Sequence, residues 1–399
     1  MTARENNVRR VLIAHQSTIP HYRVRFYELL EQMRPATWTF EVVFDCRESE
    51  NPTIFQERVD HRTFRFPILD VRTSTLTLAG RKLVWQHFWT RARNYDVIVT
   101  DTHLSNITYP AASLYKFAGK KRVFWGHVRD MNVKSAGIVK RASESVKATY
   151  LRGCDAFFAY TNGGKHELLK LGFAPSKIHV LNNTIDIKAE RAAAESHAHK
   201  RDQFRANFGV GDRTVLLHVG RLLPGKRIDF LLESFEHLLR MHHGKYHLFS
   251  VGTGPEEARL MEARSRMGSD AITHFGAVTN REQLAPIFTS SDFFIMPGYV
   301  GLAPLQAFCY DLPAVVFNLP VHSPEWEYVN PLNSYILPGD ASARDCAASF
   351  ASIEARFASR ESRAAIYPTI HHLTLENMVA AFIGGIDSVL GLQGEMRAP

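Results

Sequence analysis

The chain alternates short apolar segments, rich in β-branched residues, with longer segments in which apolar residues recur at helical spacing. The short segments have the length and composition of strands. In the first half they lie at 11–14, 41–45, 96–100, 121–125, 156–160 and 178–181. In the second half they lie at 214–219, 246–251, 272–275, 293–296, 314–317 and 334–337.

The segments between these strands predict helices. The clearest are 22–33, 228–242, 255–267, 280–289 and 302–310. A repeated order of strand, helix and strand indicates an α/β fold, in which parallel sheets are covered by helices on both faces. Two such series in one chain predict two doubly wound, Rossmann-like domains.

The boundary between the two series is a polar, alanine-rich stretch at 186–205 without strand character. We therefore expect a linker near 184–210. The expected domains are 1–190, 205–370 and a C-terminal segment 371–399. That segment contains an amphipathic helix pattern at 374–390, in which Gly384 and Gly385 are weak points because glycine destabilises a helix.

Composition narrows the class of protein. Of the 399 residues, 45% are hydrophobic and 22% are charged, which excludes a disordered, collagenous or coiled-coil chain. The four cysteines contain no C-x-x-C pair, so neither a zinc cluster nor a disulfide scaffold is expected. No apolar stretch approaches the roughly 18–20 residues of a membrane span. The stretch 11–14 is too short for a signal-peptide core, and we expect a cytoplasmic protein.

Charge is distributed unevenly along the chain. Residues 1–200 hold 31 Lys and Arg against 19 Asp and Glu, a net charge of +12, whereas the rest has a net charge of −4. A basic half suggests an anionic partner such as a membrane surface, a nucleic acid or a phosphorylated substrate, although a generally basic proteome would give the same signal. The sequence lacks an interleaved basic and aromatic motif, so we do not expect nucleic-acid binding.

Five loops in the second half directly follow predicted strands, so they should share the carboxyl edge of the sheet, where ligands bind in doubly wound folds. Glycine follows several of these strands at once, and Arg221 and Lys226 bring two cations to this edge. Each feature alone also fits an ordinary turn. Together, the glycines permit close backbone approach, two cations attract phosphate, and a helix opening at 301–302 presents free N–H groups. The sequence therefore predicts a diphosphate site there. Its candidate residues are Gly220, Arg221, Lys226, Gly252, Val278, Gly298, Gly301, Leu302 and Gln306.

The same residues carry a resemblance. The stretch 218–235 (HVGRLLPGKRIDFLLESF) resembles the "VGRL…KG…LL.AF" motif of family 4 glycosyltransferases. Stretches 251–256, 275–278 and 291–316 are similar to that family's "GdGP" turn, its base-contacting loop and its "aD.fv.PS..EgfGl..lEAma.G.PVv" segment. Stretch 181–186 resembles "v.NGvD". The first domain matches loosely, at 19–23, 125–127 and 159–161.

The resemblance implies a GT-B fold, with two Rossmann-like domains facing a cleft and the last helix returning to the first domain. It also implies a retaining, metal-independent transfer of a sugar from a UDP- or GDP-linked donor, without a further cofactor, as in polysaccharide biosynthesis. Arg221, Lys226 and the helix opening at 301–302 would stabilise the departing diphosphate. Val278 would contact the base, and His127 would lie near the transferred sugar.

The sequence departs from the family at two positions. The family has two glutamates eight positions apart, and here Gly298 and Gln306 occupy them. Gln306 can still accept a hydrogen bond from ribose, but Gly298 has no side chain to hold the sugar. Glu325, in a similar Pro-Glu pair one strand later, is a candidate replacement; it could also be a plain first-turn helix residue. The alternative function is a non-catalytic nucleotide-sugar-binding scaffold.

The first domain is expected to bind the acceptor, a glycan or a lipid-linked molecule. Its edge loops are rich in His and Arg, which suits a polar or anionic acceptor. The candidates are His21, Tyr22, Arg23, Asp101, His103 and, beside them, His127. The basic stretch 134–152 could lie on an anionic membrane, which would place the protein at the inner face of the membrane, or it could be a solvated helix face.

Overall fold

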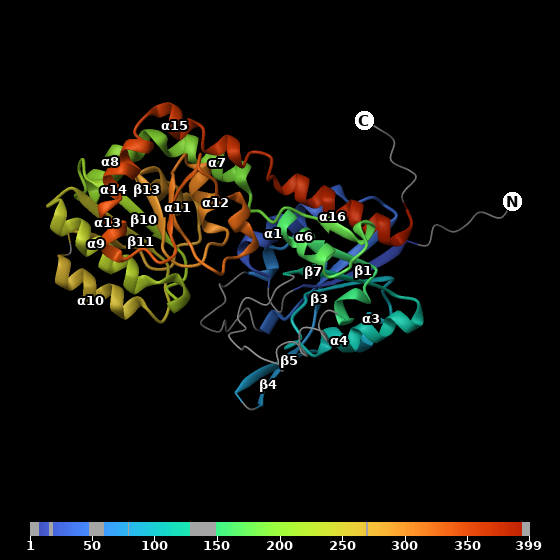
Figure 1. Ribbon diagram of the computed structural model, residues 1–399. Coiled ribbons are helices and arrows are strands. Elements are labelled where there is room, and N and C mark those ends of the chain that lie inside the picture. Colours follow the sequence, from blue (N-terminus) through green and yellow to red (C-terminus); the bar gives the residue numbers. More distant parts are fainter. Residues whose placement is uncertain are drawn as a thin grey trace. The chain divides into compact units, whose positions relative to one another are not determined.

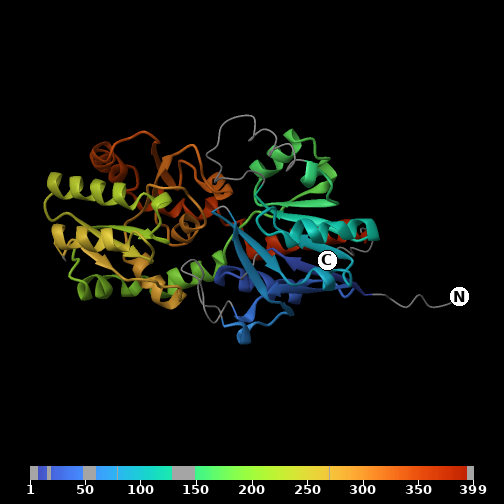
Figure 2. The same cartoon turned by 90° about the horizontal axis from the view of Figure 1, so that it is seen from below.

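The computed structural model describes residues 8–15, 19–47, 60–78, 80–127, 149–268 and 270–392. The chain divides into two compact units (Figure 1). Unit 1 contains Met1–Asn183 and Leu375–Pro399, and unit 2 contains Thr184–Thr374. Each unit is built on one parallel sheet with helices packed against it (Figures 1 and 2), so the predicted α/β fold with two Rossmann-like domains is confirmed.

Unit 1 holds a seven-stranded parallel sheet in the order β3-β2-β1-β6-β7-β8-β9. Its strands are β1 (Arg9–Ala14), β2 (Trp38–Phe44), β3 (Ile68–Asp70), β6 (Val97–Thr100), β7 (Lys121–Gly126), β8 (Ala156–Ala159) and β9 (Ile178–Val180). The order reverses at β1 and β6. In sheets of this type the carboxyl ends at the reversal are where ligands bind.

The helices of unit 1 surround this sheet. Among the described residues they are α1 (His21–Met33), α3 (Trp89–Ala92), α4 (Thr108–Ala112), α6 (Asn162–Lys170) and α16 (Leu375–Leu390), with one-turn 3-10 segments η1 (His61–Thr63), η2 (Ser113–Ala118) and η3 (Pro175–Lys177). Two further strands, β4 (Thr73–Leu78) and β5 (Arg81–Gln86), form a separate antiparallel hairpin that the sequence did not predict.

The C-terminal helix α16 belongs to unit 1, which confirms the return implied by the family resemblance. It packs against α1, β8 and β9. Phe382 of this helix is fully buried, and its ring centroid lies 5.6 Å from that of Phe26, 5.4 Å from Trp125 and 4.9 Å from Phe158. The helix therefore completes the aromatic core on one face of the sheet.

Unit 2 holds a six-stranded parallel sheet in the order β12-β11-β10-β13-β14-β15. Its strands are β10 (Thr214–Val219), β11 (Tyr246–Val251), β12 (Ile272–His274), β13 (Phe293–Met296), β14 (Ala314–Asn318) and β15 (Ser334–Pro338). Its described helices are α7 (Ile187–His197), α8 (Arg201–Asn207), α9 (Ile228–Met241), α10 (Glu257–Met267), α11 (Arg281–Thr289), α12 (Ala303–Cys309), α13 (Ala343–Ala348), α14 (Phe350–Arg356) and α15 (Arg360–Ala364).

The expected linker at 184–210 is wrong, because this segment folds as helices α7 and α8 of unit 2. Asp186 caps α7 by accepting a hydrogen bond from the backbone N–H of Ala189 at 3.2 Å. Ile187 and Ala193 are buried, and α7 packs against α11 and α12. The polar composition of the segment reflects a helix with one narrow apolar stripe.

No described helix is both long and apolar enough to cross a lipid bilayer.

Candidate functional site

The loops at the carboxyl ends of β10 and β11 lie backbone to backbone. The N–H of Gly220 donates to the Val251 carbonyl at 3.0 Å, and the N–H of Leu222 donates to the Thr253 carbonyl at 2.9 Å. Gly252 has a φ of +125°, and a Cβ there would overlap the Gly220 carbonyl group. Glycine is therefore required at 252 by both the backbone angle and the close approach. This packing fixes the backbone position of Arg221 at the carboxyl edge of the sheet.

Lys226 is the central cation of this edge. It ends the short turn η5 (Pro224–Lys226) and is buried. Its Nζ donates to the Tyr299 carbonyl oxygen at 2.9 Å and lies 3.9 Å from the centroid of the Tyr299 ring. Burial, followed by the positive charge of Arg221, lowers the pKa of Lys226 to about 8, and the carboxylate of Glu325 opposes the shift.

Glu325 lies in the first turn of η6 (Pro324–Tyr328), beyond β14, and is buried. Its turn is joined to the loop after β13, because the N–H of Ser323 donates to the Val300 carbonyl at 3.0 Å. The N–H of Val300 in turn donates to His322 Nδ1 at 3.0 Å. Two adjacent loops thus hold a carboxylate within electrostatic range of Lys226, as the sequence predicted for this edge.

Gly298 has no room for a side chain. A Cβ at this position would overlap the Gly225 carbonyl oxygen and the Lys226 Cα, and it would lie 2.6 Å from the Lys226 carbonyl carbon. The loop after β13 is therefore pressed against η5. The glutamate that the family has at this position cannot be accommodated in this backbone.

Gln306 lies on α12 and is held by Glu190, a buried residue of α7. Its Nε2 donates to Glu190 Oε2 at 3.1 Å, and the same oxygen accepts from the Tyr310 hydroxyl at 3.1 Å. Arg281 Nε donates to the other oxygen of Glu190 at 2.7 Å. The Gln306 amide nitrogen is thus engaged by Glu190. Sequence reasoning missed Glu190 because it lies in the stretch interpreted as a linker.

The helix opening at 301–302 is weaker than predicted as an anion site. Helix α12 begins at Ala303, with Leu302 as its N-cap residue. Pro304 has no N–H, and the N–H of Leu305 is bonded to the Leu302 carbonyl at 3.1 Å. Val278 is half-buried and packs against the apolar cluster beside α12.

In unit 1, four strands bring polar side chains to their carboxyl ends. His15 follows β1, Asp101 follows β6, His127 follows β7 and Tyr160 follows β8. The Tyr160 hydroxyl lies 2.9 Å from His15 Nε2, and the His127 ring centroid lies 4.8 Å from that of Tyr160. These residues form one cluster at the sheet reversal.

Burial and nearby charged groups shift the pKa values of residues in this cluster. Burial holds the pKa of His15 well below its usual value, and the charge of Arg23 lowers it further. Burial raises the pKa of the Asp101 carboxyl, while His103, whose Nε2 lies 3.8 Å from Asp101 Oδ2, opposes that shift. The predicted residues His127, Asp101 and His103 are therefore brought together at this edge.

The predicted acceptor residues of 21–23 lie on the first turn of α1, which begins one residue before the predicted helix 22–33. His21 is exposed and Tyr22 is half-buried, but Arg23 is buried inside unit 1. Arg23 donates to Asn183 Oδ1, and its guanidinium lies 5.0 Å from the Trp125 ring centroid. Arg23 therefore packs in the core of unit 1 and is not open at the edge as predicted.

Parts of the sequence-based prediction lie outside the described residues: loop residues 16–18 and 128–130, and 134–148 of the basic stretch.

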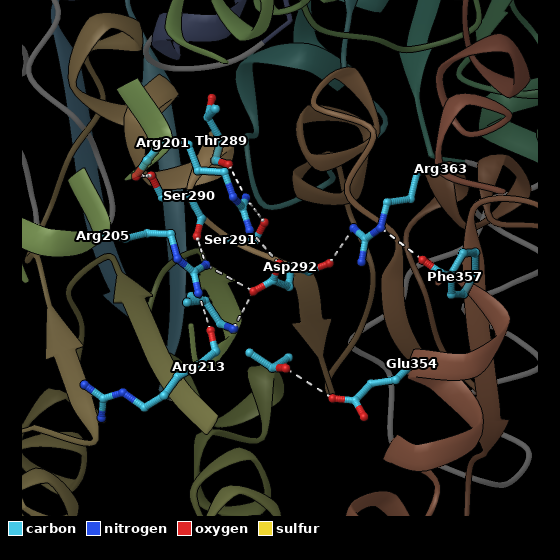
Figure 3. Close-up of polar contacts among 12 residues, drawn as sticks. Arg201, Arg205, Arg213, Thr289, Ser290, Ser291, Asp292, Glu354, Phe357 and Arg363 are labelled. Atoms are coloured by element: carbon cyan, nitrogen blue, oxygen red, sulfur yellow. Dashed lines mark hydrogen bonds and ion pairs between the residues drawn. The ribbon is translucent and has the colours of Figure 1, made fainter. Parts of the chain in front are cut away.

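A cluster of arginines at the opposite end of the unit 2 sheet is structural (Figure 3). Asp292, just before β13, accepts from Arg201 at 2.6 Å, from Arg205 at 3.2 Å and from the backbone N–H of Val215 at 2.8 Å. Arg363 donates to the Asp292 carbonyl at 3.0 Å. Asp292, near the start of the family-like stretch 291–316, thus binds arginines and backbone at the amino end of the sheet and does not form part of the ligand edge.

Comparisons with known proteins fit this geometry. The family described as "Glycosyl transferases group 1" matches residues 213–350, and "Glycosyltransferase Family 4" matches residues 23–189. An uncharacterized glycosyltransferase of Methanocaldococcus jannaschii is 28% identical over 120 residues, which are 29% of this chain and 30% of that protein. D-inositol 3-phosphate glycosyltransferase 2 of Catenulispora acidiphila is 26% identical over 176 residues, 40% of this chain and 39% of that protein. The chain thus spans less than half the length of these curated relatives.

Solved structures share the fold over nearly the whole chain. HepE of Anabaena, in complex with UDP, has a TM-score of 0.66 at 12% identity and covers 95% of this chain and 100% of its own. A glycosyltransferase from Rickettsia africae has a TM-score of 0.68 at 13% identity, with 96% and 99% covered. The solved structures show the GT-B fold, and the two family matches, which cover residues of both units, show that the chain belongs to the family 4-like glycosyltransferases.

Proposed function

We propose that the protein is a retaining glycosyltransferase that moves a sugar from a nucleotide diphosphate donor to a glycan or lipid-linked acceptor without a metal ion. The observation that carries the proposal is the buried Lys226, within electrostatic range of Arg221 and Glu325 at the carboxyl edge of the unit 2 sheet. Burying an ammonium group is unfavourable unless an anion compensates it, and a diphosphate would supply that anion.

Lys226 and Arg221 would act on the leaving group. As the bond between the sugar and the diphosphate breaks, negative charge grows on the diphosphate oxygens, and two nearby cations stabilise it more in the transition state than in the ground state. The Lys226 ammonium has three protons, and the Tyr299 carbonyl uses one of them. The Met296 sulfur lies 3.9 Å from Nζ and takes a second, weak hydrogen bond, so a phosphate oxygen would take the third proton or displace the sulfur. The backbone around Gly220, Gly252 and Gly301 would line the same subsite.

Glu325 would perform the role of the glutamate that the family has at the position of Gly298. Its carboxylate is buried next to the cations and could accept hydrogen bonds from sugar hydroxyls or stabilise the positive charge that develops on the sugar ring. Gln306 would accept a hydrogen bond from ribose through its oxygen, since Glu190 orients the amide. Val278 would contact the base.

In unit 1 we assign His127 to the transferred sugar, and Asp101, His103, His21 and Tyr22 to the acceptor. His127 is held through its backbone, since Thr102 Oγ1 donates to the His127 carbonyl at 3.0 Å. An exposed His103 beside a buried Asp101 suits a polar acceptor with hydroxyl groups.

Relatives support the donor class. HepE of Anabaena was solved with UDP and with UDP-glucose, and another protein with this fold is a lipopolysaccharide outer core galactosyltransferase. These ligands belong to those proteins, and the shared fold makes a nucleotide sugar the first donor to test.

The test is a thermal-shift screen of UDP- and GDP-sugars followed by a donor-turnover assay with and without EDTA. The true donor raises the unfolding temperature because it binds only the native state. We expect turnover to persist in EDTA and to fall about 100-fold in Arg221→Ala, the cost of losing one transition-state donor. Arg344→Ala, which removes an exposed guanidinium from α13, is the matched control and should keep full turnover. Unchanged turnover in Arg221→Ala would refute the site.

A second candidate function is nucleotide-sugar binding without turnover. The blocked Gly298 position favours it, because the family's sugar-holding glutamate has no space here. A thermal shift with a nucleotide sugar, combined with no turnover of that donor in the presence of varied acceptors, would support the binder. Any turnover that Glu325→Gln abolishes would exclude it.

A further inference from the structure

Unit 1 carries a surface of exposed apolar side chains outside the candidate site. Phe117 of η2 is 89% exposed, and Leu76 and Leu78 of strand β4 are 63% and 62% exposed. Leu114 of η2 and Leu104, in the segment before α4, are exposed as well. We name these five residues the apolar surface. Exposed apolar patches on a protein of this size commonly mark an interaction site.

Hydrogen bonds connect the elements that carry this surface. Strand β5 joins the segment before α4, because the N–H of Val84 donates to the Ser105 carbonyl at 2.8 Å and the N–H of Ile107 donates to the Val84 carbonyl at 2.9 Å. The helix α4 continues directly into η2. In Figure 1 the hairpin and α4 lie on the same lower edge of unit 1.

One face of the hairpin is apolar: Leu76 on it is exposed, whereas Leu83 and Trp85 are half-buried. Strands β4 and β5 pair only with each other as a sheet, and Leu76 stands opposite Leu83. Ser74 stands opposite Trp85, so Leu76, Leu83 and Trp85 share one face. Leu76 and Leu78 stay exposed on this face, which leaves them open to a partner.

The chain segment that carries the apolar surface is basic. Residues 71–122 contain nine Lys and Arg and two Asp and Glu. Arg72, Lys82 and Arg93 are exposed, and no acidic side chain in the described part of the chain pairs with them. Lys116 and Lys120 flank the exposed Phe117. Apolar side chains thus project from a strongly basic background.

We propose that the apolar surface and its surrounding cations dock unit 1 on an anionic lipid bilayer. The leucines and Phe117 enter the boundary between headgroups and acyl chains, and Arg72, Lys82 and Arg93 stay at the level of the anionic headgroups. The contact is peripheral. It uses residues other than the basic stretch at 134–152, and it does not depend on the proposed glycosyl transfer.

A bilayer fits these observations better than a protein partner. A stable protein interface usually has charges of both signs at its rim and a contiguous, well-packed centre. Here the apolar side chains project from a hairpin, a loop and a short 3-10 turn, and the surrounding charge is almost entirely positive. Side chains that project separately can each enter a fluid bilayer.

The experiment measures binding of the full chain to vesicles. Pure phosphatidylcholine vesicles are compared with vesicles that also contain phosphatidylglycerol, at low and at high salt. We expect binding to the anionic vesicles, weaker binding at high salt, and little binding to the neutral ones. The double variant Leu76→Ser/Leu78→Ser should bind the anionic vesicles about tenfold more weakly, because two apolar side chains no longer enter the lipid. Phe117→Ser should act in the same direction.

Leu332→Ser is the matched control, since Leu332 is 61% exposed but lies in unit 2. It should bind vesicles like the parent protein. All variants should keep the parent's unfolding temperature, because the replaced side chains are exposed. Equal binding of parent and double variant, or equal binding to neutral and anionic vesicles, would overturn the proposal. Self-association of the parent without lipid that Leu76→Ser/Leu78→Ser abolishes would assign the surface to a second copy instead.

Discussion

Lys226 illustrates how one buried residue connects local packing to ligand affinity. The Tyr299 carbonyl and ring partly compensate its charge, but burial still lowers its pKa to about 8. Because the folded-state pKa lies below the usual value for lysine, the charged form is disfavoured in the folded protein. That destabilisation is present below about pH 8 and is relieved as the pH rises toward the usual value of about 10.4.

The first prediction follows from this shift. A diphosphate binds the protonated Lys226, so its affinity should be constant below about pH 8 and fall by up to about tenfold per pH unit above it. Titration calorimetry with UDP across this range measures the effect. Lys226→Arg keeps its charge at every pH tested and should remove the fall. If the parent's affinity stays flat up to about pH 10, Lys226 does not contact the phosphates.

The second prediction concerns two glycines of the same loop. A Cβ at Gly298 would overlap the backbone of 225–226, whereas one at Gly301 would meet Ser323 Oγ at an ordinary 3.7 Å. Gly298→Ala should therefore lower the stability of unit 2 by about 1–3 kcal/mol. Gly301→Ala should be neutral or stabilise it by up to about 1 kcal/mol, because it restricts the unfolded chain.

Denaturant unfolding followed by tryptophan fluorescence compares these two variants. In the same assay Gly298→Glu should destabilise at least as much as Gly298→Ala. It should also fail to raise donor turnover, although it restores the residue type of the family. A stable, more active Gly298→Glu protein would show that the loop can open, which contradicts the packing described here.

At the scale of elements, burial on both faces decides what can be predicted from sequence. Strands β10, β11 and β13 match their predicted bounds to the residue, because apolar residues dominate them and their few polar residues, such as His218 and Ser250, are buried as well. The hairpin β4–β5 was missed, since its exposed Thr and Leu residues produce no burial pattern. Helix α7 was interpreted as a linker because its apolar stripe is short.

The same reasoning applies to the candidate site. Glycines and cations after predicted strands can be assigned to one edge, because the fold brings the carboxyl ends of parallel strands together. The blocked position at Gly298 could not be predicted, since it depends on the backbone of 225–226, more than seventy positions earlier. Glu190 was equally hidden, because its partners Gln306 and Arg281 come from two other helices.

The third prediction tests α16 through two adjacent glycines. A Cβ at Gly384 would meet nothing within 4 Å, whereas one at Gly385 would overlap the Phe158 ring. Gly384→Ala should stabilise unit 1 by about 0.5–1 kcal/mol through helix propensity alone. Gly385→Ala gains the same propensity but should destabilise the unit by about 1–3 kcal/mol through overpacking.

Thermal unfolding of the two α16 variants, each against the parent, measures this difference in sign. Equal shifts in the same direction would mean that α16 does not press on the sheet at Gly385. Because only one methyl group is added in each case, the comparison isolates the packing of the helix from its intrinsic propensity.

At the scale of the whole molecule, the two units differ in how the chain builds them. Unit 2 is one continuous stretch, and its apolar clusters on both sheet faces come from that stretch alone. Unit 1 needs both ends of the chain, because Phe382 of α16 completes the cluster that includes Phe26 and Trp125. Thr184 Oγ1 donates to the Leu373 carbonyl at 2.7 Å. The segment that leaves unit 1 and the segment that returns to it therefore lie side by side at this point.

This difference predicts how the protein can be divided. Residues 184–374 expressed alone should fold and unfold cooperatively, since no part of their core is removed. Residues 1–183 alone should show secondary structure without fixed tertiary packing, because Phe26, Trp125 and Phe158 lose the cover of α16. Joining 183 to 375 through a short Gly-Ser linker should restore cooperative unfolding of unit 1, since the chain ends already meet. Near-ultraviolet circular dichroism and melting curves distinguish these states, and a fully packed 1–183 fragment would mean that α16 covers the core without being needed for it.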